Sequence, residues 1–142
     1  AQDECFFAEK GQGAWMNETR MRVSGRRSMV DCVFATGLPS AGRSDLPQTL
    51  KDLAQILPVT AGVRNLGSPA LNLAYVAAGR FDGVWERRLK VWDLAAGIVI
   101  LKEAGGFIDS IYSGGNMLKD GTVIGSNDQI FSQFSKAIRK ST

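Results

Sequence analysis

Carboxylates and one short hydroxyl motif are the groups of this chain that could do chemistry. The 142 residues include no histidine, which removes imidazole bases, Ser-His-Asp triads and most zinc, copper or haem ligation. Asp93 stands at the mouth of an apolar, helix-like stretch, where the helix dipole holds a carboxylate ionised. It is therefore either a helix cap or a ligand for a hard cation such as magnesium. Glu86 ends a strand-like run near the same edge, and alone it indicates a surface charge.

The segment Gly67-Ser68-Pro69 is the second candidate site. It places a turn glycine, a capping hydroxyl and a first-turn proline in order, which predicts a helix start. Free N–H groups at such a start favour an anion or a hydroxyl group, although helix capping alone also explains the three residues. Ligands of open α/β sheets gather at loops that lead into helices, so both helix starts are candidate ligand sites.

Helix and strand patterns that could position these groups alternate along most of the chain. Apolar residues at helical spacing predict a helix that Ser44 caps and Pro58 ends, and the stretch 94–101 is apolar all round, which predicts a buried helix. The alternation predicts an α/β fold, with helices packed on a sheet from both sides. The expected helices are 46–57, 69–78, 93–104 and 127–138, and the expected strands are 31–36, 59–66, 81–86, 107–109 and 122–124.

The N-terminal segment reads as a hairpin, with strands at 4–9 and 19–23 and a turn at Gly11-Gln12-Gly13. Two strands without further partners are barely stable in water. The first residues also lack an initiator methionine and a signal-peptide pattern. We therefore expect residues 1–24 to be a hairpin from the end of a missing N-terminal domain, and residues 25–142 to be a C-terminal α/β domain.

Composition narrows the class of protein. The hydrophobic content of 44% is enough for one sizeable core, and the longest apolar run is far shorter than the roughly 20 residues that cross a bilayer. Cys5 and Cys32 show no metal-binding or redox spacing, which indicates a reducing, cytoplasmic setting. The net charge of +3 includes basic clusters at 20–27 and 87–90. Nucleic acid is a possible partner, but a solvated face is favoured because no aromatic residues interleave with these clusters.

The segment 92–106, Trp-Asp-Leu-Ala-Ala-Gly-Ile-Val-Ile-Leu-Lys-Glu-Ala-Gly-Gly, resembles the C-terminal signature of the inositol monophosphatase family. The segments 8–14, 22–24 and 67–83 support the resemblance upstream. Nearly the whole chain is therefore similar to the second half of that family, which implies a C-terminal α/β domain with a mixed sheet flanked by helices.

The resemblance implies a role for each candidate residue. Asp93 would be the C-terminal ligand of a catalytic Mg²⁺ ion, and Glu86 would accept a hydrogen bond from a substrate hydroxyl. Gly67, Ser68 and Pro69 would line the substrate pocket. The family usually has alanine where this chain has Pro69, which has no N–H to donate.

The family's remaining metal ligands lie in a glutamate motif and an Asp-Pro-x-Asp-Gly motif that this sequence does not contain. We therefore expect the chain alone to be inactive. Joined to its missing N-terminal half, it would form a phosphatase, commonly a homodimer, for inositol monophosphate or a similar polyol phosphate. Alternatives are a phosphatase for fructose bisphosphate, a nucleotide 3'-phosphate or histidinol phosphate, and a non-catalytic regulatory module that binds RNA or protein.

Overall fold

The N-terminal strands form a small sheet of their own. The computed structural model describes residues 3–41 and 45–142, and in it three antiparallel strands lie in the order β1-β2-β3. The two expected strands are present as β1 and β3, but they do not pair with each other, because the unpredicted strand β2 lies between them. Strands β2 and β3 are joined by a two-residue turn between Met16 and Thr19. Asn17 in this turn adopts the left-handed conformation, with φ 53°, and asparagine is a preferred residue in such tight hairpin turns. The strands are β1 (Phe6–Glu9), β2 (Gly13–Met16) and β3 (Thr19–Met21).

The main sheet has five strands in the order β5-β4-β6-β8-β7. Strand β4 pairs in parallel with β5 and β6, whereas β8 pairs antiparallel with β6 and β7. The predicted mixed sheet is confirmed. The strands are β4 (Val33–Thr36), β5 (Gly62–Arg64), β6 (Gly83–Glu86), β7 (Phe107–Asp109) and β8 (Val123–Ser126).

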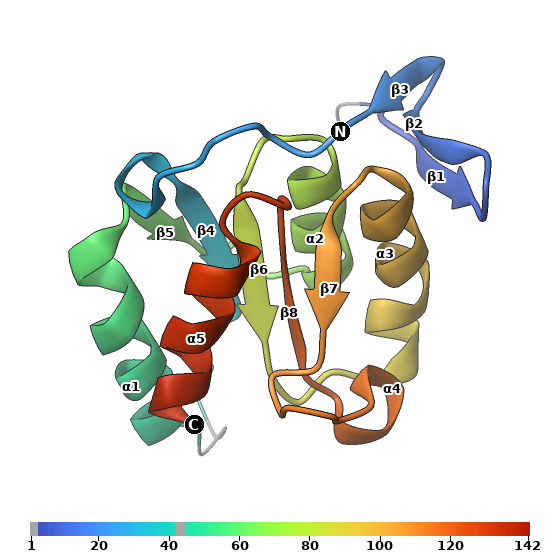
Figure 1. Ribbon diagram of the computed structural model, residues 1–142. Helices are drawn as coiled ribbons and strands as arrows, with labels where there is room; N and C mark the ends of the chain where they lie inside the picture. Colours follow the sequence, from blue (N-terminus) through green and yellow to red (C-terminus); the bar gives the residue numbers. More distant parts are fainter. Residues whose placement is uncertain (1–2, 42–44) are drawn as a thin grey trace.

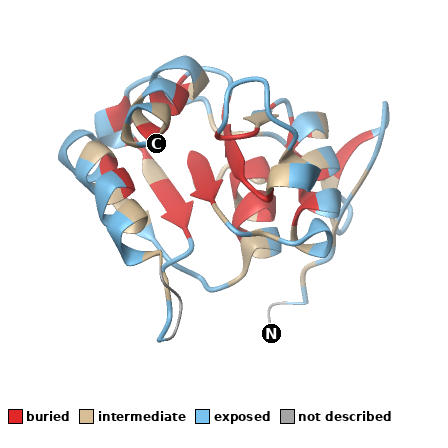
Figure 2. Cartoon of the chain, turned by 90° about the horizontal axis from the view of Figure 1, so that it is seen from below, coloured by how far each residue is buried: buried red, intermediate tan, exposed pale blue. Residues whose placement is uncertain are grey.

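Helices cover both faces of this sheet, as predicted (Figure 1). Helices α1 (Leu46–Ile56) and α5 (Phe131–Ser141) pack on one face, and α2 (Pro69–Ala77) and α3 (Val91–Glu103) pack on the other. The two-residue period of the strands divides the core between the faces. In β6, for example, Val84 packs with α2 and α3 and Trp85 packs with α5. Buried residues accordingly concentrate in the sheet and on the inward sides of the helices (Figure 2).

Helix α3 is not buried all round, so that prediction is wrong. It begins two residues earlier than expected, and Trp92 is 78% exposed, with Val91 and Val99 also exposed. Its buried side is narrow: Gly97 lies directly against Leu73 of α2. Apolar composition alone could not separate the two sides, because both carry similar residues.

Other element boundaries differ from the sequence prediction for local reasons. The strand expected at 59–66 shortens to β5 because Leu57–Val59 form a 3-10 turn. Helix α5 starts later than expected, because the Asn127 side chain accepts the Gln129 and Ile130 N–H groups ahead of it. A short helix, α4 (Met117–Asp120), was not predicted. Ser44, the predicted cap of α1, lies outside the described residues, and no described helix is long and apolar enough to cross a membrane.

Candidate active site

The candidate residues gather at one edge of the main sheet. Strands β4 and β6 run in parallel, so their last residues, Thr36 and Glu86, lie at the same edge. Helices α2 and α3 begin at this edge, at the lower end of the sheet in Figure 1. The topology therefore places the end of β6 beside the two helix starts that were singled out by sequence.

The start of α2 is built as its sequence predicts. Gly67 has φ 74°, and Pro69 occupies the first helical position. The Ser68 hydroxyl oxygen accepts the Leu71 N–H at 3.3 Å, which caps the helix. The Gly67 N–H donates to the Asn65 side chain at 3.0 Å, so this backbone donor is already engaged.

Asp93 is the third residue of α3. Its Oδ2 accepts the Lys90 backbone N–H at 3.0 Å, which satisfies a donor just before the helix. Among the described residues no donor is recorded for its second oxygen, Oδ1. One oxygen thus caps the helix while the other is available to a cation, so the two roles considered for Asp93 are compatible.

Glu86 is buried, at 6% exposure, and is not the surface charge that its position alone indicated. Its Oε1 accepts a hydrogen bond of 2.7 Å from Asn72 Nδ2. Burial raises the pKa of Glu86 to about 7; the Asn72 bond opposes this rise, and the negative charge of Asp93 adds to it. The two carboxylates therefore interact electrostatically.

Two residues at this edge were missed by the sequence analysis. Asn72, in the first turns of α2, donates a hydrogen bond to Glu86. Gly37, the residue after β4, lies so close to Glu86 that a Cβ on Gly37 would be 2.7 Å from Glu86 Oε2. Asn72 did carry a signal, because it is the one polar residue between Leu71 and Val76 apart from the hydroxyl of Tyr75. A polar side chain within an apolar helix indicates a specific hydrogen-bond partner.

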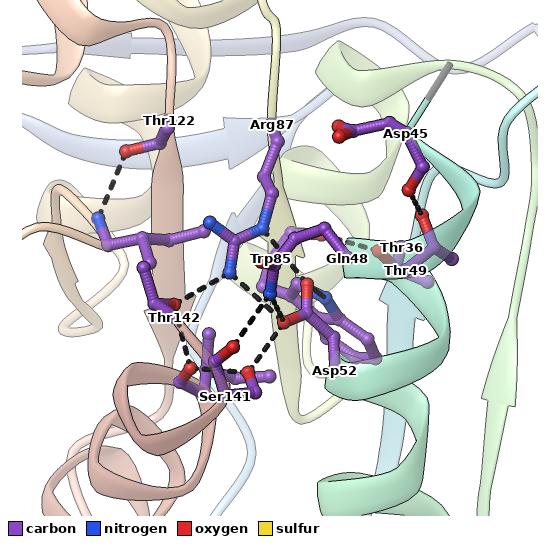
Figure 3. Close-up of polar contacts among 12 residues, drawn as sticks. Thr36, Asp45, Gln48, Thr49, Asp52, Trp85, Arg87, Thr122, Ser141 and Thr142 are labelled. Atoms are coloured by element: carbon purple, nitrogen blue, oxygen red, sulfur yellow. Dashed lines mark hydrogen bonds and ion pairs between the residues drawn. The ribbon is translucent and has the colours of Figure 1, made fainter. Parts of the chain in front are cut away.

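The opposite face of β6 is fixed by a polar network, drawn in Figure 3. Asp52 of α1 accepts Trp85 Nε1 at 3.2 Å and two hydrogen bonds of 3.0 Å from Arg87. Trp85 and Arg87 flank Glu86 in sequence, so their side chains point away from it across the strand. The end of β6 is consequently held from both sides.

The described residues form no complete metal site, although one of them has suitable chemistry. Carboxylate oxygens are the ligands that Mg²⁺ prefers, and Asp93 fits that chemistry. In the part of the chain that the structure describes, however, no three Asp, Glu, Cys or His side chains are grouped to hold a metal ion. Two surface hollows, of about 590 and 470 Å³, are lined by none of the five predicted site residues. The described residues therefore do not complete a metal centre, and the candidate site is an open edge.

Comparison with known proteins shows that this chain matches part of longer relatives. The chain is 46% identical over 140 residues to an inositol-1-monophosphatase of Mesorhizobium japonicum, covering 99% of this chain and 53% of that protein. It is 38% identical to a putative Nus factor SuhB of Neisseria meningitidis serogroup B, covering 96% of this chain and 52% of the relative. The chain thus spans about half the length of these curated relatives.

Solved structures show the same relationship. The crystal structure of the extragenic suppressor protein suhB from Bartonella henselae matches with a TM-score of 0.92 and 42% identity, over 99% of this chain and 54% of that one. An IMPase from Thermotoga maritima matches with a TM-score of 0.86 and 38% identity, over 98% and 52%. The sequence profile of the inositol monophosphatase family covers residues 1–142. The chain belongs to the inositol monophosphatase family and corresponds to the C-terminal portion of its members.

Proposed function

We propose that this chain is the C-terminal half of a magnesium-dependent phosphatase that hydrolyses inositol monophosphate or a similar polyol phosphate. The observation that carries the proposal is the meeting of Glu86, Asp93 and the start of α2 at one sheet edge, in a chain similar to inositol-1-monophosphatases. Strands β1 to β3 would complete a sheet whose other strands lie in the N-terminal half. In this proposal residues 1–24 end the first domain and residues 25–142 form the second.

In the proposed enzyme Asp93 supplies one carboxylate to a magnesium site whose other ligands come from the N-terminal half. Bound magnesium would activate water and stabilise the leaving oxygen of the phosphate ester. Oδ1 of Asp93, which accepts no recorded hydrogen bond from the described residues, suits this role, because Oδ2 is engaged with the Lys90 N–H. One carboxylate cannot assemble such a centre, so the chain alone is proposed to be inactive.

Glu86 is proposed to accept a hydrogen bond from a hydroxyl group of the substrate. The carboxylate is held by Asn72 through Oε1, which leaves Oε2 for a ligand. Gly67, Ser68 and Pro69 would line the same pocket from the start of α2. Since Pro69 has no N–H, recognition of the polyol there would depend on the Ser68 hydroxyl and on shape.

The test is magnesium-dependent phosphate release from inositol 1-phosphate by the full-length protein and by residues 1–142 alone. We expect turnover only from the full-length protein. Fructose 1,6-bisphosphate, a nucleotide 3'-phosphate and histidinol phosphate, assayed in parallel, identify the substrate class. Turnover by the isolated chain would contradict the proposal. The proposal would also be contradicted if the full-length protein hydrolysed none of these substrates.

A regulatory role on RNA is the second candidate, because some relatives are named Nus factors. The two basic clusters give RNA binding limited support, because several of their arginines are paired with carboxylates. Arg26 pairs with Asp82, Arg87 with Asp52 and Arg88 with Asp45, and paired arginines attract phosphates less strongly. A gel-shift titration of the full-length protein with single-stranded RNA at two salt concentrations tests this role. A strongly salt-dependent shift without phosphatase activity would favour it.

The setting and assembly follow from the same proposal. The cysteines are free thiols, with Cys5 exposed and Cys32 buried, as suits a reducing compartment such as the cytoplasm. The full-length enzyme is proposed to be a homodimer, as its family resemblance implies. Analytical ultracentrifugation of the full-length protein measures that state directly.

A further inference from the structure

Asn72 is a buried polar residue whose side-chain hydrogen bonds are only half satisfied by the described residues. It is 1% exposed within α2, where its described buried neighbours are Leu73, Ala74, Val76 and Ala77. Its Nδ2 donates to Glu86 Oε1, but its Oδ1 finds no hydrogen-bond partner among the described residues. A buried acceptor without a hydrogen bond destabilises a fold. Leucine has a similar volume and would remove that acceptor, but it would leave the buried Glu86 Oε1 without its Asn72 donor, so the asparagine is tied to the Glu86 carboxylate.

The position of Asn72 links the two parts of the candidate site. Its backbone N–H bonds the Ser68 carbonyl at 2.9 Å, one helical turn back at the cap of α2. Its side chain reaches across to the end of β6 and meets Glu86 at 2.7 Å. One residue therefore contacts both the helix start and the carboxylate that are proposed to meet the substrate.

The second carboxylate oxygen of Glu86, Oε2, lies next to the backbone of Gly37. The two are close enough that even one added carbon on Gly37 would clash. With Oε1 held by Asn72 and the carboxylate confined by Gly37, the group has little freedom to rotate. The amide also donates rather than accepts, which favours the ionised, hydrogen-bond-accepting form of Glu86 against the effect of burial.

We propose that Asn72 is a positioning residue for substrate recognition: it holds Glu86 Oε1 from α2 and so aims Oε2 at a substrate hydroxyl. The inference rests on the proposed function, because it assigns Asn72 a role through the substrate contact of Glu86. Asn72 itself does not touch the substrate. Its loss should weaken substrate binding and leave the chemical step largely intact.

The kinetic test uses Asn72→Leu in the full-length protein, assayed with inositol 1-phosphate at saturating magnesium. We expect KM to rise about tenfold while kcat changes by less than about threefold, the pattern of a lost binding interaction. Asn127→Leu is the matched control, since Asn127 is equally buried but bonds Ser24 and Arg26 away from Glu86. It should lower the thermal midpoint without raising KM. Asn72→Ser, whose side chain is too short to reach Glu86, replaces Asn72→Leu if that variant does not fold.

A double-mutant cycle separates positioning from a general structural effect. In a Glu86→Gln background, Asn72→Leu should change KM by less than about twofold, because the group that it positions is already altered. The same tenfold rise in both backgrounds, or no rise in either, would overturn the inference.

A readout that needs no activity separates this inference from the proposed function. The Glu86 carboxyl, followed by ¹³C NMR in the full-length protein, should show a higher pKa in Asn72→Leu than in the parent, since the opposing hydrogen bond is lost. An unchanged pKa would overturn the inference even if the enzyme is active. A raised pKa in a protein without phosphatase activity would support the contact and reject the proposed function instead.

Discussion

Arg87 donates two hydrogen bonds of 3.0 Å to Asp52, one from Nε to Oδ2 and one from Nη2 to Oδ1. This two-point pair is largely buried, with the Asp52 side chain 2% and the Arg87 side chain 11% exposed. Ser141, in the last turn of α5, also donates to Asp52, at 2.6 Å. The pair therefore links α1, the segment that follows β6, and α5 (Figure 3).

Asp52→Asn should destabilise the protein by roughly 3 kcal/mol, because it leaves the Arg87 charge buried without its partner. Urea unfolding followed by circular dichroism measures the change. Asp128→Asn is the control, since Asp128 is exposed and its recorded bond is to the neighbouring Gln129 side chain. If Asp52→Asn lowers the free energy of unfolding no more than the control does, the network contributes little to stability.

Gly97→Ala should destabilise the protein although alanine is the better helix former by about 1 kcal/mol. A Cβ at Gly97 would lie 2.5 Å from Leu73 Cδ1 and 2.9 Å from Leu73 Cβ, and Leu73 is fully buried. Overpacking of this kind costs about 1–3 kcal/mol, so we expect a lower thermal midpoint. Gly25→Ala, where a Cβ meets nothing within 4 Å, should change it little. A higher midpoint for Gly97→Ala would mean that α2 and α3 separate easily.

Asp93→Asn in the full-length protein distinguishes the cap from the metal ligand. Asparagine caps a helix nearly as well as aspartate, so stability without metal should change by less than about 1 kcal/mol. Turnover should fall on the order of a hundredfold or more, roughly 3 kcal/mol of transition-state stabilisation, with a higher magnesium requirement. Steady-state kinetics across a magnesium titration measure both effects. Near-parental turnover would leave Asp93 as a cap alone.

Glu86 should make stability fall as pH rises. Its pKa lies at about 7 in the folded protein, above the ordinary 4.5, so between these values the folded state binds more protons than the unfolded state. The free energy of unfolding should therefore decrease from pH 4.5 to pH 7, by about 3 kcal/mol from this group. Glu86→Gln, which cannot ionise, should equal the parent near pH 4 and be more stable above pH 7.

The measurement is urea unfolding at several pH values without magnesium, taken as the difference between Glu86→Gln and the parent. Other titrating groups cancel in that difference. A constant difference for Glu86→Gln across the pH range would rule out the burial effect.

Local chemistry was enough to predict much of the scaffold. Ser68 and Pro69 start α2 because a capping oxygen and a fixed φ act within one helical turn, and Asp93, the third residue of α3, accepts the Lys90 N–H just before that helix. The alternation of helix and strand likewise predicted an α/β fold with helices on both faces of a sheet. These features depend on residues a few positions apart, which a sequence displays directly.

The contacts that shape the site depend on tertiary structure. Asn72 and Glu86 are 14 residues apart, and Asp52 and Arg87 are 35 apart, so only the packing of α2 and α1 on the two faces of the sheet brings each pair within hydrogen-bond distance. The sequence by itself determined that Glu86 ends a strand, whereas the packing of α2 and Gly37 around it decided that the carboxylate is buried and aimed. Burial and direction are properties of the surroundings of a side chain, and those surroundings come from distant segments of the chain.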